Sequence, residues 1–207
     1  MDTFYEQLNT IFTLWNQIYS RWISEELFSS AWFAILGSMV VAYTLLYLLI
    51  DRKRMRELFF YGSLLSVAFG FIDVAGTTFG LWAYKTHFLP LIPALFPSTF
   101  TLHPIMYMIA YQYSPDWRTF TVNNTIATVF FAFVTQPLYI WAGILWFENW
   151  NYLYSFVLSG SISFFARAVV LWMAKVEQNH APETSRISLS PKFQPAMKPL
   201  NKDDENK

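Results

Sequence analysis

The chain has 207 residues, of which 55% are hydrophobic and 20% aromatic but only 14% charged. An ordinary soluble domain carries about 25% charged residues, so this deficit predicts a surface that largely faces lipid. Fourteen basic residues balance fourteen acidic ones, which leaves no field to attract nucleic acid, and the absence of cysteine excludes disulfides, thiolate zinc sites and cysteine nucleophiles. We therefore expect an all-α integral membrane bundle whose first partner is the lipid bilayer.

Residues 1–26 predict an amphipathic helix that lies at the membrane interface. Apolar side chains recur there at helical spacing, at Phe4, Leu8, Ile11, Trp15, Ile18 and Trp22. The stretch lacks the basic start and small-residue cleavage site of a signal peptide. The same stripe also suits a helix that packs back onto the bundle, and the sequence leaves both alternatives open.

Apolar stretches between residues 27 and 174 predict a bundle of about five transmembrane helices. Four of them have clear bounds, at Leu27–Ile50, Leu58–Trp82, Phe120–Trp146 (with a kink at Pro137) and Leu153–Ala174. Prolines interrupt the remaining stretch, so we expect irregular chain over 89–97 and a shorter helix from about residue 98 or 99 to 113. The polar composition of residues 175–207 predicts a disordered cytoplasmic tail.

Basic residues predict the orientation of the bundle. Arg52, Lys53, Arg54 and Arg56 crowd the link after the first span, and such links stay in the cytoplasm. Alternation then places the N-terminus outside and the C-terminus in the cytoplasm, with the protein in a bacterial inner membrane. Aromatic side chains gather near the predicted outer boundary, which is typical of an aromatic belt: Trp82, Tyr84, Trp146, Trp150, Tyr152 and Tyr154.

Four polar residues inside the predicted spans are candidates for function. An ionisable group at this depth costs roughly 2.5 to 3.5 kcal/mol on insertion scales. Asp73 and His103 fall at a similar level toward the outer side, where they form a proton relay, a ligand-binding corner or a structural hydrogen bond. Thr77, at i+4, is a local hydroxyl partner for Asp73. Arg167 lies about 10 Å from the inner end of its span, which favours snorkelling over an ion pair with Asp73.

A weak parallel repeat relates the second and fourth spans. Asp73 to Leu81 and Gln136 to Ile144 occupy similar positions 63 residues apart. Two spans per period preserve orientation, as a tandem duplication in a membrane requires. Gln136 itself stands beside Pro137, where we expect its side chain to satisfy backbone groups that the proline frees.

Several segments occur in a characteristic order: Asp51-Arg52-Lys53-Arg54, then Asp73…Gly76-Thr77…Gly80-Leu81-Trp82-Ala83-Tyr84, then Leu89-Pro90…Phe96-Pro97, then Pro137-Leu138…Trp150-Asn151-Tyr152…Tyr154-Ser155-Phe156. This order resembles a family of uncharacterised small multi-spanning membrane proteins of endospore-forming bacteria. The resemblance implies about five spans and no established activity. A weaker likeness is to the small membrane subunits of bacterial lycopene cyclases, but the paired acids of that family are missing from residues 96–104.

The chain carries no phosphate-binding glycine loop, zinc-type histidine spacing or nucleophile elbow, so we predict no cofactor and no metal. We expect a non-catalytic multi-pass module that binds a partner protein or lipid, or a second copy of itself, rather than an enzyme. The alternatives are a small ion or proton conductor that uses Asp73 and an isoprenoid- or carotenoid-modifying enzyme. A conductor requires polar positions on one face of several spans, and the sequence suggests this only for the second span.

Overall fold

The computed structural model describes residues 2–91 and 99–180. Its helices are α1 (Asp2–Arg21), η1 (Trp22–Glu26), α2 (Ser30–Leu49), η2 (Arg52–Arg54), α3 (Met55–Thr78), α4 (Leu102–Gln112), α5 (Trp117–Phe130), η4 (Phe131–Thr135), α6 (Gln136–Trp141) and α7 (Tyr152–His180). Two short strands, β1 (Trp82–Tyr84) and β2 (Leu145–Phe147), pair antiparallel. The predicted all-α class is confirmed, with this strand pair as an addition.

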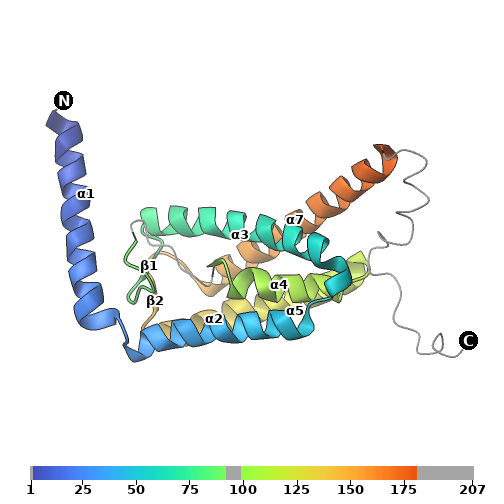
Figure 1. Ribbon diagram of the computed structural model, residues 1–207, viewed down its shortest axis with the longest axis horizontal. Helices are drawn as coiled ribbons and strands as arrows, with labels where there is room; N and C mark the ends of the chain where they lie inside the picture. Colours follow the sequence, from blue (N-terminus) through green and yellow to red (C-terminus); the bar gives the residue numbers. More distant parts are fainter. Residues whose placement is uncertain (1, 92–98, 181–207) are drawn as a thin grey trace, which may run out of the picture.

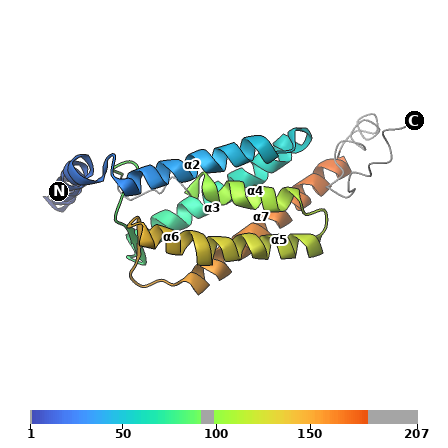
Figure 2. The ribbon, with the colours of Figure 1, turned by 90° about the horizontal axis from the view of Figure 1, so that it is seen from below.

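The long helices lie side by side along the longest axis of the molecule (Figures 1 and 2). The strands β1 and β2 lie together at one end of this bundle, which we call the strand end. The links between α2 and α3 and between α4 and α5 lie at the opposite end. We call it the basic end, because it carries the charged stretch 51–57.

Three helical stretches are long and apolar enough to cross a membrane: Ser30–Leu49, Arg52–Thr78 and Tyr152–Asn179. They confirm that the chain has membrane-spanning character. The predicted third span corresponds to α4, which has 11 residues and a length of about 16 Å, against a hydrocarbon core of about 30 Å. The predicted fourth span corresponds to α5, η4 and α6, a helical run that contains a π-helical turn ahead of Pro137.

The ends of several helices differ from the predicted bounds for local reasons. α2 begins three residues late because Phe28 has a positive φ of 61° and the Ser29 side chain accepts from the Trp32 N–H as a helix cap. α4 begins at Leu102, later than predicted, with Pro104 in its first turn. α7 continues past Ala174 to His180, so the predicted start of the tail at residue 175 is wrong. Lys175, Glu177 and Gln178 are good helix formers, and no proline interrupts the chain between Lys175 and residue 182, whereas the rest of the predicted tail lies outside the described residues.

The helices α3 and α6 end in the same way, which supports the 63-residue repeat. Each passes into its strand through a glycine with positive φ, Gly80 at 68° and Gly143 at 72°. The backbone bond from Leu81 N to Gly76 O (2.9 Å) matches the bond from Ile144 N to Tyr139 O (2.8 Å). Ala83 pairs with Trp146, its own equivalent in the repeat, so the two strands are related by a local two-fold axis.

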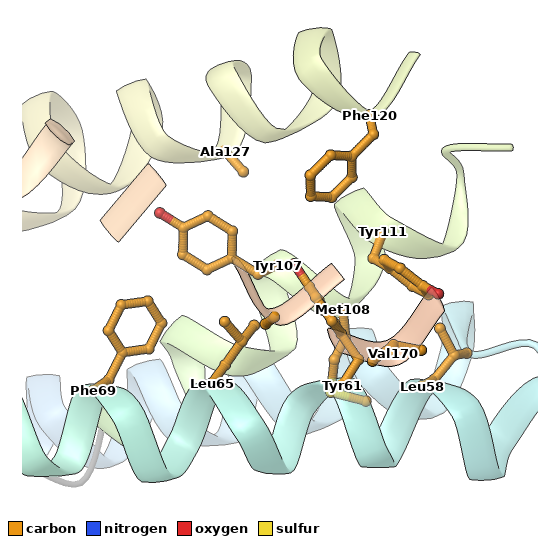
Figure 3. Packing of buried hydrophobic residues seen from close by; sticks show 11 residues of the cluster. Leu58, Tyr61, Leu65, Phe69, Tyr107, Met108, Tyr111, Phe120, Ala127 and Val170 are labelled. Carbon is orange, nitrogen blue, oxygen red and sulfur yellow. The ribbon is translucent and has the colours of Figure 1, made fainter. Parts of the chain in front are cut away.

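The core at the middle and the basic end of the bundle is rich in tyrosine (Figure 3). Tyr61, Tyr107 and Tyr111 are almost fully buried there beside Leu65 and Phe120. A second apolar cluster at the strand end includes Ile35, Trp82, Tyr139, Ile144 and Leu145. These clusters hold the helices in a fixed arrangement around the polar groups between them.

The N-terminal helix α1 runs across the direction of the bundle instead of along it (Figure 1). Its stripe residues Phe4, Ile11 and Trp15 are 60%, 52% and 41% exposed, whereas Trp22, at the end of the stripe, donates to His87 O at 3.0 Å. The end of α1 is held at buried Glu26, which accepts hydrogen bonds from Arg21 Nε (2.8 Å) and His87 N (2.6 Å). These contacts fix α1 to the strand end.

The contact between Gly76 of α3 and Trp82 of β1 suggests a test of the fold. A Cβ on Gly76 would overlap the ring of Trp82, which is buried and cannot move freely. We expect Gly76→Ala to destabilise the protein by about 1 to 3 kcal/mol through overpacking, measured by thermal unfolding in detergent. Gly37→Ala is the matched control, because nothing lies within 4 Å of a Cβ there, and an equal loss in both variants would contradict the packing of Trp82 on α3.

Candidate functional site

A partly enclosed cavity of about 90 Å³ lies at the strand end, between α3, α4, the η4–α6 turn and α7. The strands β1 and β2 form part of its wall. Seven of the sixteen lining residues are aromatic: Phe69, Trp82, Tyr84, Phe131, Tyr139, Phe147 and Trp150. Polar side chains enter from several elements: Asp73, Thr99, His103, Gln136, Ser155 and Ser159. The cavity therefore combines an aromatic wall with a small set of converging polar groups, as ligand sites do.

The carboxylate of Asp73 is held by the strand that follows its own helix. Asp73 is 4% exposed, and its Oδ1 accepts from Trp82 Nε1 (3.2 Å) and from the Tyr84 hydroxyl. Thr99 donates to Oδ2 at 3.4 Å. Because Gly80 turns the chain back after α3, residues close in sequence reach the carboxylate. Hydrogen bonds to a charged acceptor are stronger than neutral ones, so this network fixes the strand against the helix.

Tyr84 lies outside the three spanning stretches and keeps its proton. Burial, followed by the charge of the neighbouring Asp73 carboxylate, raises the pKa of the Tyr84 phenol well above its ordinary value of 10.0. The phenol is therefore a donor to Asp73 throughout the physiological range.

Gln136 presents an unsatisfied acceptor in the same cavity. The residue is 8% exposed, and its Oε1 has no hydrogen-bond partner among the described residues. It occupies the position that corresponds to Asp73 in the repeat, directly after the π-helical turn Phe131–Thr135. π-Helical turns are frequent at functional sites, and buried acceptors without a partner are rare. The geometry indicates a donor that a bound molecule supplies.

His103 lines the cavity together with Asp73, as their predicted common level implies. Its ring packs edge-on against Phe131, with centroids 4.0 Å apart, and tilts against Phe69 at 5.6 Å. α4 begins at Leu102, one residue before His103, so the histidine enters the cavity from the first turn of that helix.

Thr77, a further candidate from the sequence, does not line the cavity. The Thr77 hydroxyl donates to the backbone carbonyls of Asp73 (2.9 Å) and Val74 (3.1 Å), so its predicted role as partner of the carboxylate is wrong. At a buried helix position the nearest acceptor of a threonine is the carbonyl one turn earlier.

Arg167 lies toward the basic end and does not snorkel. It is 3% exposed, donates to Ser114 O at 3.0 Å and lies over the ring of Phe120 at 4.5 Å. Tyr111 and Trp117 also present their faces to the guanidinium, at 5.2 and 5.1 Å. The predicted snorkelling fails because these rings and one carbonyl replace the headgroups as partners of the charge.

The sequence interpretation missed part of the cavity wall. Trp82, Tyr84 and Trp150, which we predicted to be belt residues, line the cavity instead, whereas Trp146 and Tyr154 are 46% and 53% exposed. Gln136 was interpreted as a partner for backbone groups near Pro137. The 63-residue repeat is the sequence signal that indicates Gln136 as a cavity residue, because it aligns Gln136 with Asp73.

No protein-family model, curated protein or solved structure matches this chain. The family resemblances therefore remain predictions, and the function has to be argued from the geometry of the cavity. Within residues 2–91 and 99–180, no three His, Asp or Glu side chains gather in a way that would hold a metal ion.

The Asp73 network provides a direct test. Tyr84→Phe removes a donor to a buried carboxylate, which costs about 1.5 to 3 kcal/mol for a charged hydrogen bond. We expect a lower thermal midpoint in detergent for this variant. Tyr154→Phe, at an exposed tyrosine of the same end, should leave the midpoint unchanged, and equal midpoints in the two variants would exclude the Tyr84–Asp73 bond as a stabilising contact.

Proposed function

We propose that this chain is a multi-pass membrane protein that binds a small ammonium-bearing ligand in the cavity at the strand end. The observation that carries the proposal is the convergence of the buried Asp73 carboxylate and the unpartnered Gln136 Oε1 on an aromatic cavity. Carboxylate and amide oxygens accept hydrogen bonds from an ammonium group, and aromatic faces attract its charge.

The size of the cavity limits the ligand. A volume of about 90 Å³ is well below the roughly 300 to 1,000 Å³ of pockets for drug-sized molecules. The cavity therefore suits a head group alone, with the rest of the molecule outside it. The ethanolamine head of a phospholipid and a free primary amine share this chemistry, and the lipid fits the expected role of the chain as a lipid-binding module.

The bundle that presents this cavity has five membrane helices in our proposal. α4 and the run α5–η4–α6 lie alongside the three long spans in both views, which supports their place in the membrane (Figures 1 and 2). The basic end carries Arg52, Lys53 and Arg54, so it faces the cytoplasm of a bacterial cell. The N-terminus and the cavity then lie on the outer side, and α1 lies along the membrane surface.

An enzymatic role has less support. Acid–base catalysis requires several ionisable groups around one substrate, and the described cavity wall offers Asp73 and His103 with two phenols. An isoprenoid-modifying activity would rest on the resemblance to lycopene cyclase subunits alone. The non-catalytic binding role is therefore our proposal.

The orientation is testable because the native chain has no cysteine. Single cysteines are introduced at exposed positions, Asn149→Cys at the strand end and Lys53→Cys at the basic end. We expect a membrane-impermeant maleimide to label only Asn149→Cys in intact cells or spheroplasts, and both variants after lysis. Labelling of Lys53→Cys before lysis would reverse the proposed topology.

The ligand is tested by titration of the purified protein in detergent with dihexanoyl phosphatidylethanolamine and with ethanolamine, followed by calorimetry. Dihexanoyl phosphatidylglycerol, which lacks an amine, is the control lipid. We expect Asp73→Asn and Gln136→Leu each to weaken binding about tenfold, which is about 1.4 kcal/mol.

Glu148→Gln is the matched control variant, because this exposed carboxylate lies at the same end but outside the cavity wall. Binding of the lipid but not of ethanolamine would assign the site to a lipid head group. Equal binding of both lipids, or unchanged binding in Asp73→Asn, would exclude the ammonium site.

A further inference from the structure

A set of buried polar side chains occupies the core between the cavity and the basic end. On α7 it consists of Ser155, Ser159, Ser163 and Arg167, spaced four residues apart and 4%, 3%, 0% and 3% exposed. Residues four apart lie on one face of a helix, and this face points into the bundle. We call this set, with the groups that contact it, the polar track.

Side chains from three other helices join the track. The Ser163 Oγ lies 2.6 Å from the Tyr61 hydroxyl of α3 and donates to Asn124 Oδ1 of α5 at 2.5 Å. The Tyr107 hydroxyl of α4 donates to Thr128 Oγ1 at 3.3 Å. Figure 3 shows Tyr61 and Tyr107 inside the core of the bundle. Polar positions thus face inward on several helices, which is the feature that a conducting protein requires and that the sequence suggested for one span only.

The track extends from the cavity toward the basic end, where a stack of two tyrosine rings leads to Glu57. Ser155 and Ser159 line the cavity at the strand end. Toward the basic end, the Tyr61 ring stacks on Tyr111 at 4.3 Å, and the Tyr111 hydroxyl donates to Glu57 Oε1 at 2.6 Å. Asp73 and Glu57 are sixteen residues apart on one helix, or about 24 Å of a hydrocarbon core about 30 Å thick.

One buried amide of the track leaves a donor open to a water molecule. Asn124 is 1% exposed, and its Nδ2 has no hydrogen-bond partner among the described residues. Successive serines of α7 are about 6 Å apart along the axis, a gap that one water molecule bridges between two hydroxyl groups. A water at Asn124 would satisfy the amide and link it to the neighbouring hydroxyls.

We propose that the polar track conducts protons between Asp73 in the cavity and Glu57 at the basic end. Each hydroxyl or water accepts a proton on its oxygen and releases its own proton to the next group, so no group is altered after one passage. The Glu57 carboxylate, which accepts from the Tyr111 hydroxyl, provides a negative terminus for protons at the basic end. This activity goes beyond ligand binding, which does not need the track.

The test is proton flux into liposomes that contain the purified protein and the pH dye pyranine, driven by a potassium gradient with valinomycin. We expect the wild type to acidify the interior faster than protein-free liposomes. Tyr61→Phe and Ser163→Ala each remove one hydroxyl from the middle of the track and should lower the rate at least tenfold. Ser161→Ala is the matched control, because this serine is exposed on the same helix.

A wild-type rate equal to that of protein-free liposomes would overturn the proposal, and this measurement depends on no variant. Full flux in both Tyr61→Phe and Ser163→Ala would overturn it as well, because the protons would then follow another route. Calorimetric binding of phosphatidylethanolamine is measured on the same preparations. Loss of proton flux in Tyr61→Phe and Ser163→Ala with intact lipid binding supports the track. Intact proton flux in a wild-type protein that does not bind the lipid rejects the ligand proposal alone.

Discussion

The arrangement at the strand end depends on the burial of one carboxylate in an apolar bundle. A charge at this depth is costly unless hydrogen-bond donors surround it, and Trp82 and Tyr84 supply two of these donors. They reach Asp73 only if the helix ends soon after it and the chain reverses, which the positive φ of Gly80 allows. The end of α3, the course of β1 and one wall of the cavity thus follow from the solvation of Asp73.

The second half of the repeat keeps this geometry but changes its chemistry. Gly143 turns the chain as Gly80 does, and β2 pairs with β1 about the local axis. Gln136, in the place of the carboxylate, is neutral, and the residues that correspond to the two donors are Leu145 and Phe147, which offer no side-chain hydrogen bond. One half therefore satisfies its polar group internally, while the other leaves an acceptor open. The ligand proposal rests on this asymmetry.

Long apolar runs predicted α2, α3 and α7 well, because the match between helix length and bilayer thickness is a property of sequence alone. Helical rise also places Asp73 and His103 at a common depth, and both residues line the cavity. The cage around Arg167 was not predictable, because Trp117 and Phe120 come from another helix and their positions depend on tertiary packing. The interpretation of single polar residues fails where a distant element, and not a neighbour in sequence, supplies the partner.

The serines of α7 show why the polar interior was hard to recognise. A serine adds little to hydropathy and closes a hydrogen bond to the carbonyl one turn earlier, as Ser159 does with Ser155 O at 2.6 Å, so a run of serines reads as an ordinary apolar span. Inside a bundle such a hydroxyl also bonds to other helices: Ser163 donates its proton to Asn124 Oδ1, and its oxygen lies 2.6 Å from the Tyr61 hydroxyl. Small side chains also let the helices approach closely, which brings tyrosines of α3 and α4 within reach. Close packing and a polar interior therefore arise from the same residues, because the hydroxyl groups of the bundle hydrogen-bond to one another in the absence of bulk water.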